Sequence, residues 1–182
     1  IEARMNEFEA GSFSDTTTLD GKAVFFLGAV DGITDAYATG TDATKGSEAV
    51  TLSYAYQMNL NTSFTGDDNL YVRLKTGGGD GENFANKFAT YHNEETDNDD
   101  IIRVDKIWYT FPVSDKITAT VGPRIENYYM LAASPSVYKP KVLKAFRFGG
   151  HGIAFGASTS TGLGLKYTAD NGFASSITIN SK

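Results

Sequence analysis

From residue 49 onward, apolar and polar residues alternate along the chain with a period of two. In the stretch 50–64 the odd positions are mostly polar, and the even positions are largely apolar: Val50, Leu52, Tyr54, Tyr56, Met58, Leu60 and Phe64. Successive side chains of a β-strand point to opposite faces, so the pattern predicts a strand with one apolar and one polar face. Its length exceeds the ~5–6 residues usual in globular sheets and reaches the ~9–11 residues with which a strand crosses a bilayer.

Six other segments have strand-like patterns, at 16–30, 70–75, 102–108, 117–124, 163–167 and 173–179. The first of these is apolar at both odd and even positions, which indicates either a bulge or a buried segment. In 102–108, the residues Ile102, Val104 and Trp108 share the apolar face and alternate with Arg103 and Asp105. Short polar turns at 66–69, 114–116 and 170–172 join the segments into hairpins, so we expect about seven antiparallel strands.

The connections between these strands alternate in length. The short turns are separated by long connections at 31–48, at 77–100 and at roughly 126–157. Soluble β-sandwiches do not systematically place short connections at one end of the strands and long connections at the other. A transmembrane barrel does, with short turns at one rim and long loops at the other. The pattern therefore predicts an all-β fold, a transmembrane antiparallel β-barrel.

The composition agrees with a barrel and excludes other classes of protein. Aromatic residues make up 13% of the chain, and many lie near strand ends, where they are expected to form interfacial girdles: Tyr54, Tyr56, Phe64, Tyr71, Trp108, Tyr109, Phe111, Tyr167 and Phe173. The alternative is that these residues are good strand formers in a soluble core. The net charge of −6 argues against binding to nucleic acid, and the absence of cysteine excludes disulfides and thiolate metal sites.

The two ends of the chain suggest an incomplete barrel. Ile1, Met5 and Phe8 have helical spacing, so residues 1–11 are expected to end a helical or coiled-coil spacer, and residues 12–182 to form the barrel. Seven strands cannot close an antiparallel barrel, which needs an even number. One alternative is a small closed barrel with an eighth strand within 142–155.

Four segments resemble a known family: FSDTTTL at 13–19, LNTSFTGDD at 60–68, IWYTFP at 107–112 and TVGP at 120–123. They are similar to the cyanobacterial outer-membrane porins that carry S-layer-homology domains, in particular the marine picocyanobacterial type. The resemblance implies a signal peptide, a wall-binding S-layer-homology domain, a coiled-coil spacer and a barrel of roughly sixteen strands, of which this chain would be the first half. It also implies a homotrimer in the outer membrane, in contact with lipid and attached to peptidoglycan only through the missing N-terminal domain. The chain departs from the family in lacking that domain and a terminal aromatic residue.

If the apolar face of each strand meets lipid, the opposite face lines water. This places six charged residues on the pore wall: Arg73, Lys75, Arg103, Asp105, Arg124 and Lys166. Such a mixed wall would be weakly selective among ions and small hydrophilic solutes. The alternative is that these charges keep the lumen wet and have no individual role.

The segment 126–155 is long, basic and aromatic. We expect it either to fold inward as a constriction loop or to pack outside on neighbouring subunits; its candidate residues are Tyr128, Tyr129, Lys139, Lys141, Lys144 and Arg147. Inside the lumen, these side chains would favour anions or sugars.

Catalytic and metal sites have little support in the sequence. His92 and His151 lie in predicted loops without a nucleophile elbow or metal-ligand spacing, and Gly77–Gly81 lacks the lysine and the helix of a phosphate loop. The acidic stretch 94–100 is expected to be solvated. We therefore predict a passive diffusion channel that is not an enzyme and has no cofactor; the alternative is a soluble β-sandwich carbohydrate-binding module.

Overall fold

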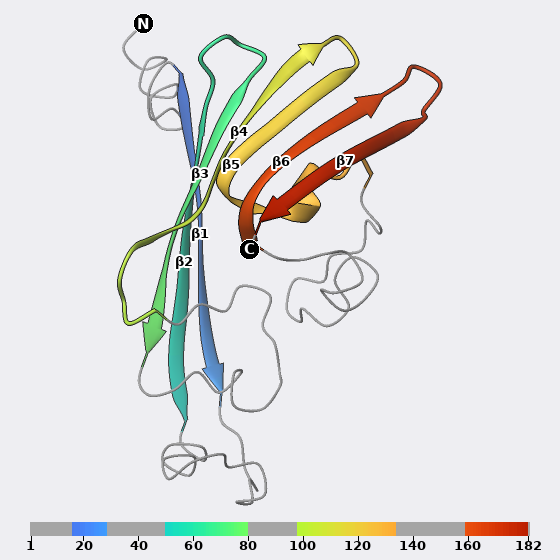
Figure 1. Cartoon of the computed structure of the whole chain (residues 1–182). Helices are drawn as coiled ribbons and strands as arrows, with labels where there is room; N and C mark the ends of the chain where they lie inside the picture. Colours follow the sequence, from blue (N-terminus) through green and yellow to red (C-terminus); the bar gives the residue numbers. More distant parts are fainter. Residues whose placement is uncertain (1–15, 29–49, 80–97, 134–158, 182) are drawn as a thin grey trace, which may run out of the picture.

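The computed structural model describes residues 16–28, 50–79, 98–133 and 159–181 (Figure 1). These residues form one antiparallel sheet in which each strand pairs with the next along the chain. The strands are β1 (Thr17–Gly28), β2 (Thr51–Thr62), β3 (Asn69–Gly79), β4 (Arg103–Ser114), β5 (Ile117–Glu126), β6 (Thr159–Thr168) and β7 (Ala174–Ser181). One 3₁₀ helix, η2 (Asn127–Met130), follows β5.

The seven predicted strands and their hairpin order are thereby confirmed. The turns β2–β3, β4–β5 and β6–β7 all lie at the same end of the strands, which is the upper end in Figure 1. Gly66 and Gly172 provide the positive φ angles of two of these turns, 99° and 86°. The predicted long connection at 77–100 is shorter than expected, because residues 77–79 still belong to β3. The predicted helical spacer 1–11 and the possible eighth strand at 142–155 lie outside the described residues.

One face of the sheet is apolar along its whole width. Cross-strand pairs such as Leu19 with Leu60 and Leu165 with Ile177 place apolar side chains next to each other in successive strands. These side chains remain accessible: Phe25 is 72% exposed and Ile177 is 71% exposed. Within the described residues, no second layer covers this face as a β-sandwich would require. It is an extended apolar surface of the kind that meets another apolar phase.

A β-bulge in β4 changes the face on which part of that strand lies. Arg73 pairs with Lys106 and Leu74 pairs with Val104, so Asp105 is the extra residue and has no partner in the register. As a result, Trp108 pairs with Tyr71 on the polar face. The prediction that Trp108 shares the apolar face with Ile102 and Val104 is therefore wrong, because a strict period of two fails across a bulge. The bulge that was possible in the first segment is absent from β1, which pairs with β2 in unbroken register.

The polar face also carries a small buried cluster of described residues. Trp108, Ile125 and Met130 are buried against one another, and Tyr71 packs on this cluster. η2 brings Met130 to β6, where the strand has two glycines on its polar face, so the helix lies against the sheet instead of extending from it. In the described part of the chain, β1 and β7 each have a single neighbouring strand. No described helix is long and apolar enough to cross a membrane.

Candidate functional site

The polar face of β1–β4 is organised in three rows of side chains that run across the strands. The aromatic row, nearest the short turns, consists of Thr18, Asn61, Tyr71 and Trp108. The mixed row consists of Asp20, Asn59, Arg73 and Lys106, with the bulged Asp105 beside them. The cationic row consists of Lys22, Gln57, Lys75 and Arg103. The antiparallel register therefore sorts side chains from four strands into bands of different chemistry.

In the mixed row, the bulged Asp105 holds two cations. Its Oδ2 accepts a hydrogen bond from Arg73 Nε at 2.6 Å and lies 2.5 Å from Arg73 Nη2. Its Oδ1 lies 3.3 Å from Lys106 Nζ, which also donates to Thr159 Oγ1 at 2.6 Å. The side chains of Arg73 and Lys106 are only 14% and 8% exposed, and Glu126 approaches Arg73 Nη2 at 3.6 Å. Both carboxylate oxygens of Asp105 are therefore occupied, as a half-buried ion pair requires.

Amide groups extend this network toward β1 and β2. Asn59 donates from Nδ2 to Asp20 Oδ1 at 2.5 Å, and its Oδ1 accepts from the hydroxyl of Tyr71 at 2.8 Å and from Gln57 Nε2 at 3.0 Å. Asn59 thus connects the three rows through a single side chain. An amide with three such hydrogen bonds fixes the relative positions of its neighbours.

The cationic row differs from the mixed row because none of its members is a carboxylate. Lys75 pairs directly with Arg103 across β3 and β4, and Lys22 lies two strands away on the other side of Gln57. Arg103 is exposed and forms no ion pair with any other residue that the structure describes. A narrow gap in this region, too small for a water molecule, is lined by Lys22, Val24, Ala55, Gln57 and Lys75. Like charges that face each other across a ladder destabilise a sheet, so this arrangement has a cost.

A series of aromatic rings leads from the sheet onto η2. The ring of Trp108 lies 4.4 Å from that of Tyr71 and 5.0 Å from that of Tyr129, measured between centroids. The ring of Tyr129 in turn stacks on Tyr128 at 4.8 Å. Trp108 is buried, whereas Tyr129, which lies between Trp108 and Tyr128 in the series, is 38% exposed. An exposed ring held by neighbouring rings offers a flat apolar surface to a solute.

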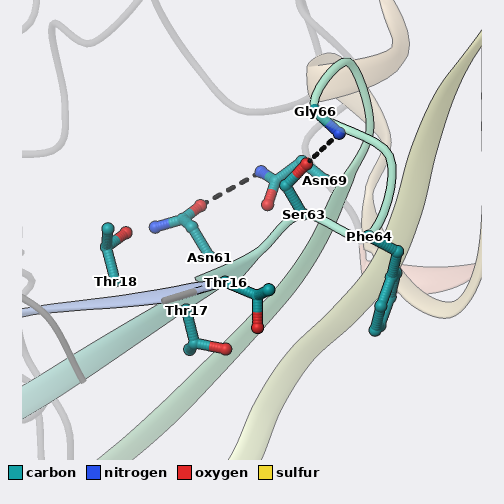
Figure 2. A pocket seen from close by; sticks show the side chains of 8 residues that line it. All are labelled: Thr16, Thr17, Thr18, Asn61, Ser63, Phe64, Gly66 and Asn69. Carbon is teal, nitrogen blue, oxygen red and sulfur yellow. Dashed lines mark hydrogen bonds between the residues drawn. The ribbon is translucent and has the colours of Figure 1, made fainter. Parts of the chain in front are cut away.

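A neutral hollow lies at the short-turn end of β1 and β2, and Figure 2 shows the residues that line it. They are Thr16, Thr17, Thr18, Asn61, Ser63, Phe64, Gly66 and Asn69. Ser63 Oγ accepts from the backbone N–H of Gly66 at 2.9 Å, and Asn69 Nδ2 donates to Asn61 Oδ1 at 3.1 Å (Figure 2). The lining has hydroxyl and amide groups, one aromatic ring and no charge, which suits uncharged hydroxyl-rich solutes better than ions.

The structure brings some of the predicted site residues together and separates others. Arg73 and Asp105 form an ion pair, and Lys75 faces Arg103. Lys166 lies apart on β6, in register with Thr118 and Ser176. A register shift in β5 places Arg124 across from Ile107, where its Nε donates to the backbone oxygen of Asp105 at 3.2 Å. Its role as a pore-lining residue stays a prediction.

For the expected constriction loop, the structure describes only the first two of the candidate residues. Tyr128 and Tyr129 lie on η2, which packs against β5, β6 and β7. The other candidates, Lys139, Lys141, Lys144 and Arg147, fall outside the described residues, as do His92 and His151. No group of three or more potential metal ligands occurs among the residues that are described.

Sequence reasoning missed Lys106, Lys22 and Glu126. Lys106 occupies an even position in β4, so alternation assigns it to the apolar face, and the bulge reverses that assignment. Lys22 lies in the segment 16–30, where apolar residues occur at both odd and even positions, so the sequence did not show on which face Lys22 lies. Glu126 lies at the end of β5, where the sequence predicted a loop, so its approach to Arg73 was not foreseen.

Comparisons with known proteins give a single family. The family model described as carbohydrate-selective porin, OprB family, matches residues 1–175. The uncharacterized protein alr4550 of Nostoc sp. is 30% identical over 141 residues, which are 70% of this chain and 23% of that protein. The uncharacterized protein sll0772 of Synechocystis sp. is 29% identical over 128 residues, 67% of this chain and 21% of that protein. The chain thus spans less than a quarter of the length of these two relatives, and no solved structure gives a significant match.

Proposed function

Since the chain belongs to the carbohydrate-selective porin family OprB, we propose that its sheet forms part of the wall of a water-filled channel in the outer membrane. Through this channel, small hydrophilic solutes and ions diffuse passively. The OprB family is a family of channels and not of enzymes, and its members reside in the outer membrane of Gram-negative bacteria. The substrate range of the whole protein is part of the proposal, because the chain covers only a fraction of its relatives.

One observation supports this function above the others: the sheet has an exposed apolar face and a charged, hydrogen-bonded opposite face. The strands are 8 to 12 residues long, close to the ~9–11 residues that cross a hydrocarbon layer at a tilt. Lipid would cover the apolar face, and backbone groups are satisfied by the neighbouring strands. A hydrated polar face removes the cost of taking a charged or hydroxylated solute through hydrocarbon.

Two features of the polar side support sugars as solutes. Tyr129 presents an exposed ring above the wall, and aromatic faces stack on the apolar faces of sugar rings. The hollow at the short-turn end offers neutral hydroxyl and amide groups to sugar hydroxyls. We further propose, on the resemblance to cyanobacterial porins alone, that the channel is a homotrimer attached to the cell wall through another part of the protein.

Neighbouring residues on β6 provide a matched test, because Leu165 lies on the apolar face and Lys166 on the polar face. The variants L165C and K166C are prepared in the full-length protein in outer membranes, and each is treated with a charged, water-soluble thiol reagent. We expect the reagent to modify K166C and to reduce the conductance, and to leave L165C unmodified until the membrane is dissolved. Equal modification of both variants in intact membranes would contradict the proposal that the sheet forms part of a channel wall. The absence of any channel conductance from the full-length protein would contradict it as well.

A further inference from the structure

We propose that the neutral hollow at the short-turn end of β1 and β2 binds a single saccharide ring and selects uncharged sugars over acidic ones. The proposal rests on the proposed function, because a sugar that passes through the channel must reach this end of the wall. It goes further in two respects. It gives the sugar a defined position on the wall, and it gives the wall a preference that depends on the charge of the sugar.

The hollow has room for a sugar ring, and one of its walls is rigid. Its volume is about 490 Å³, within the ~300–1,000 Å³ of small-molecule sites. Ser63 Oγ donates to Asp68 Oδ1 at 2.9 Å and accepts from the backbone N–H of Gly66 at 2.9 Å. The same carboxylate oxygen accepts from the backbone N–H of Phe64 at 2.9 Å. The β2–β3 turn is thus held in one conformation before a ligand arrives, which lowers the entropic cost of binding.

Two polar groups of the hollow are available to a ligand. Thr18 and Asn61 are partners across β1 and β2, and Figure 2 shows the amide nitrogen of Asn61 on the side of Thr18. Asn61 uses its Oδ1 to accept from Asn69 Nδ2. Neither the Thr18 hydroxyl nor Asn61 Nδ2 bonds another side chain or backbone group in the part of the chain that the structure describes. A hydroxyl that donates and accepts, next to an amide that donates, matches neighbouring hydroxyl groups of a sugar.

Phe64 adds an apolar surface to these polar groups. It is 64% exposed, although its ring lies 6.3 Å from the ring of Tyr109, with an angle of 57° between the ring planes. Most of the Phe64 ring therefore stays uncovered. A sugar ring can place its apolar C–H face on an aromatic ring while the hydroxyl groups at its rim reach hydrogen-bond partners. The hollow thus suits a saccharide better than an inorganic ion, for which it has no opposite charge, or an apolar solute.

The charges around the hollow are negative. Among the described residues of the lining and the two positions on either side of it, the charged side chains are Asp20, Asp67 and Asp68. The next cations along the same strands are Lys22 on β1 and Arg73 on β3, each four positions beyond the lining. At ~3.3 Å per residue, this is roughly 13 Å along the strand. A sugar acid would carry its carboxylate into a field of like charge, so the hollow should prefer uncharged sugars.

The test uses the full-length protein in detergent, with Thr18→Cys as the reporter and glucose as the probe. A small uncharged reagent alkylates the thiol, and mass spectrometry follows the modification of the peptide that contains position 18. We expect glucose to slow this modification. Glucuronate has the same ring with a carboxylate, and at low salt it should need an about tenfold higher concentration for the same protection. The difference should shrink at high salt, which screens the charges.

Phe64→Ala and Phe173→Ala form a matched pair. Phe173 is 60% exposed near the β6–β7 turn, and its ring lies 6.3 Å from that of Tyr167 with an angle of 55° between the ring planes. In the T18C background, F64A should raise the half-protecting glucose concentration about tenfold, and F173A should leave it unchanged. Both rings are exposed, so both variants should keep the folded band on heat-modifiable gels.

Bilayer recordings on the wild-type protein distinguish the saccharide site from the channel. The wild-type protein should conduct, and glucose should reduce its current at lower concentrations than it reduces the current of F64A. If glucose does not protect the thiol of T18C, or if F64A behaves like F173A, the saccharide site is wrong, whether or not the protein conducts. Equal protection by glucose and glucuronate at low salt would overturn the selection by charge. A protected thiol in a protein without conductance would overturn the proposed function and leave the saccharide site standing.

Discussion

Gly164 on β6 lies so close beneath Met130 of η2 that a Cβ atom on this glycine would be 2.7 Å from the Cβ of Met130 and 3.0 Å from its sulfur. Gly162, two residues earlier on the same face, would bring a Cβ to 3.1 Å from the Met130 methyl group. Met130 itself is fully buried. The two glycines therefore form the surface on which η2 rests, and they determine how closely Tyr128 and Tyr129 approach the sheet.

The first prediction follows from this contact. Gly164→Ala forces a steric overlap, so we expect η2 to move away from β6, with a loss of about 1–3 kcal/mol in the free energy of unfolding. Because η2 lies on the polar side of the sheet, this movement takes it further into the proposed lumen, so the single-channel conductance should fall in the same variant. Thermal unfolding on heat-modifiable gels and bilayer recordings measure the two effects.

Gly21→Ala is the matched control for this substitution. Gly21 lies on the apolar face of β1, where an added Cβ would make an ordinary contact of 3.4 Å with the backbone oxygen of Gln57. We expect this variant to keep the wild-type stability and conductance. If G164A has the stability and conductance of the wild-type protein, the position of η2 does not depend on the glycines of β6.

The second prediction concerns Trp108, which links the sheet to η2. Its ring is 6% exposed and packs between Tyr71 and Tyr129, so Trp108→Ala should cost about 3–5 kcal/mol in stability. Trp108→Phe keeps an aromatic ring, so its free energy of unfolding should fall clearly less than that of Trp108→Ala. The temperature at which the folded band disappears on gels ranks the three proteins, and equal values for alanine and phenylalanine would contradict a role for ring packing.

The third prediction addresses the bulged Asp105. Asp105→Asn removes the negative charge that holds Arg73 and Lys106, and both cations are mostly buried. We expect a loss of about 2 kcal/mol, less than for a fully buried pair because Asp105 is itself 25% exposed. The ratio of anion to cation permeability should increase, since two unpaired cations remain on the wall.

Asp115→Asn makes the same chemical change in the exposed β4–β5 turn and should leave stability and permeability unchanged. A D105N protein as stable as wild type would show that the ion pair contributes nothing to the fold. A permeability ratio that shifts toward cations would contradict the placement of Arg73 and Lys106 on the channel wall.

The strands were predictable from the sequence because the apolar face follows a period of two over long stretches. Leu52, Met58 and Leu60 establish that period in β2, and the later strands repeat it except across the bulge in β4 and the register shift in β5. The polar face was less predictable where the backbone breaks the period. Asp105 is the extra residue of a bulge, and no residue type in the sequence of β4 marks its position. The sequence alone therefore assigned Trp108 to the wrong face and overlooked Lys106.

The rows across the sheet could not be derived from single-strand patterns. They depend on register, which turn lengths fix only for strands joined by short turns. β2 and β3 are joined in this way, so the pairing of Asn59 with Arg73 follows from the turn at 63–68. The partners of Lys22 and Arg103 are set across long connections, so the cationic row emerged only from the three-dimensional structure.

The last prediction concerns Asp68, at the end of the β2–β3 turn, outside the proposed membrane-spanning segments. Its Oδ2 accepts from the Tyr109 hydroxyl at 2.6 Å, and its Oδ1 accepts from the hydroxyl and backbone N–H of Thr65, the hydroxyl of Ser63 and the backbone N–H of Phe64 at 2.7–2.9 Å. The bond from Tyr109, followed by those from Thr65 and Ser63, holds the pKa of the Asp68 carboxyl well below its usual range. The carboxylate therefore closes the turn and ties it to β4.

A carboxyl whose pKa is lower in the folded than in the unfolded state stabilises the fold above its unfolded pKa of about 3.9 and loses this contribution as the pH falls through the folded pKa. We expect the wild-type unfolding temperature to fall between about pH 5 and pH 2 and Asp68→Asn to be less stable at neutral pH, with the gap closing over the same interval. Asp115→Asn, outside this hydrogen-bond network, should follow the wild-type curve. A constant difference between D68N and wild type from pH 7 to pH 2 would show that the turn does not depend on the charge of Asp68.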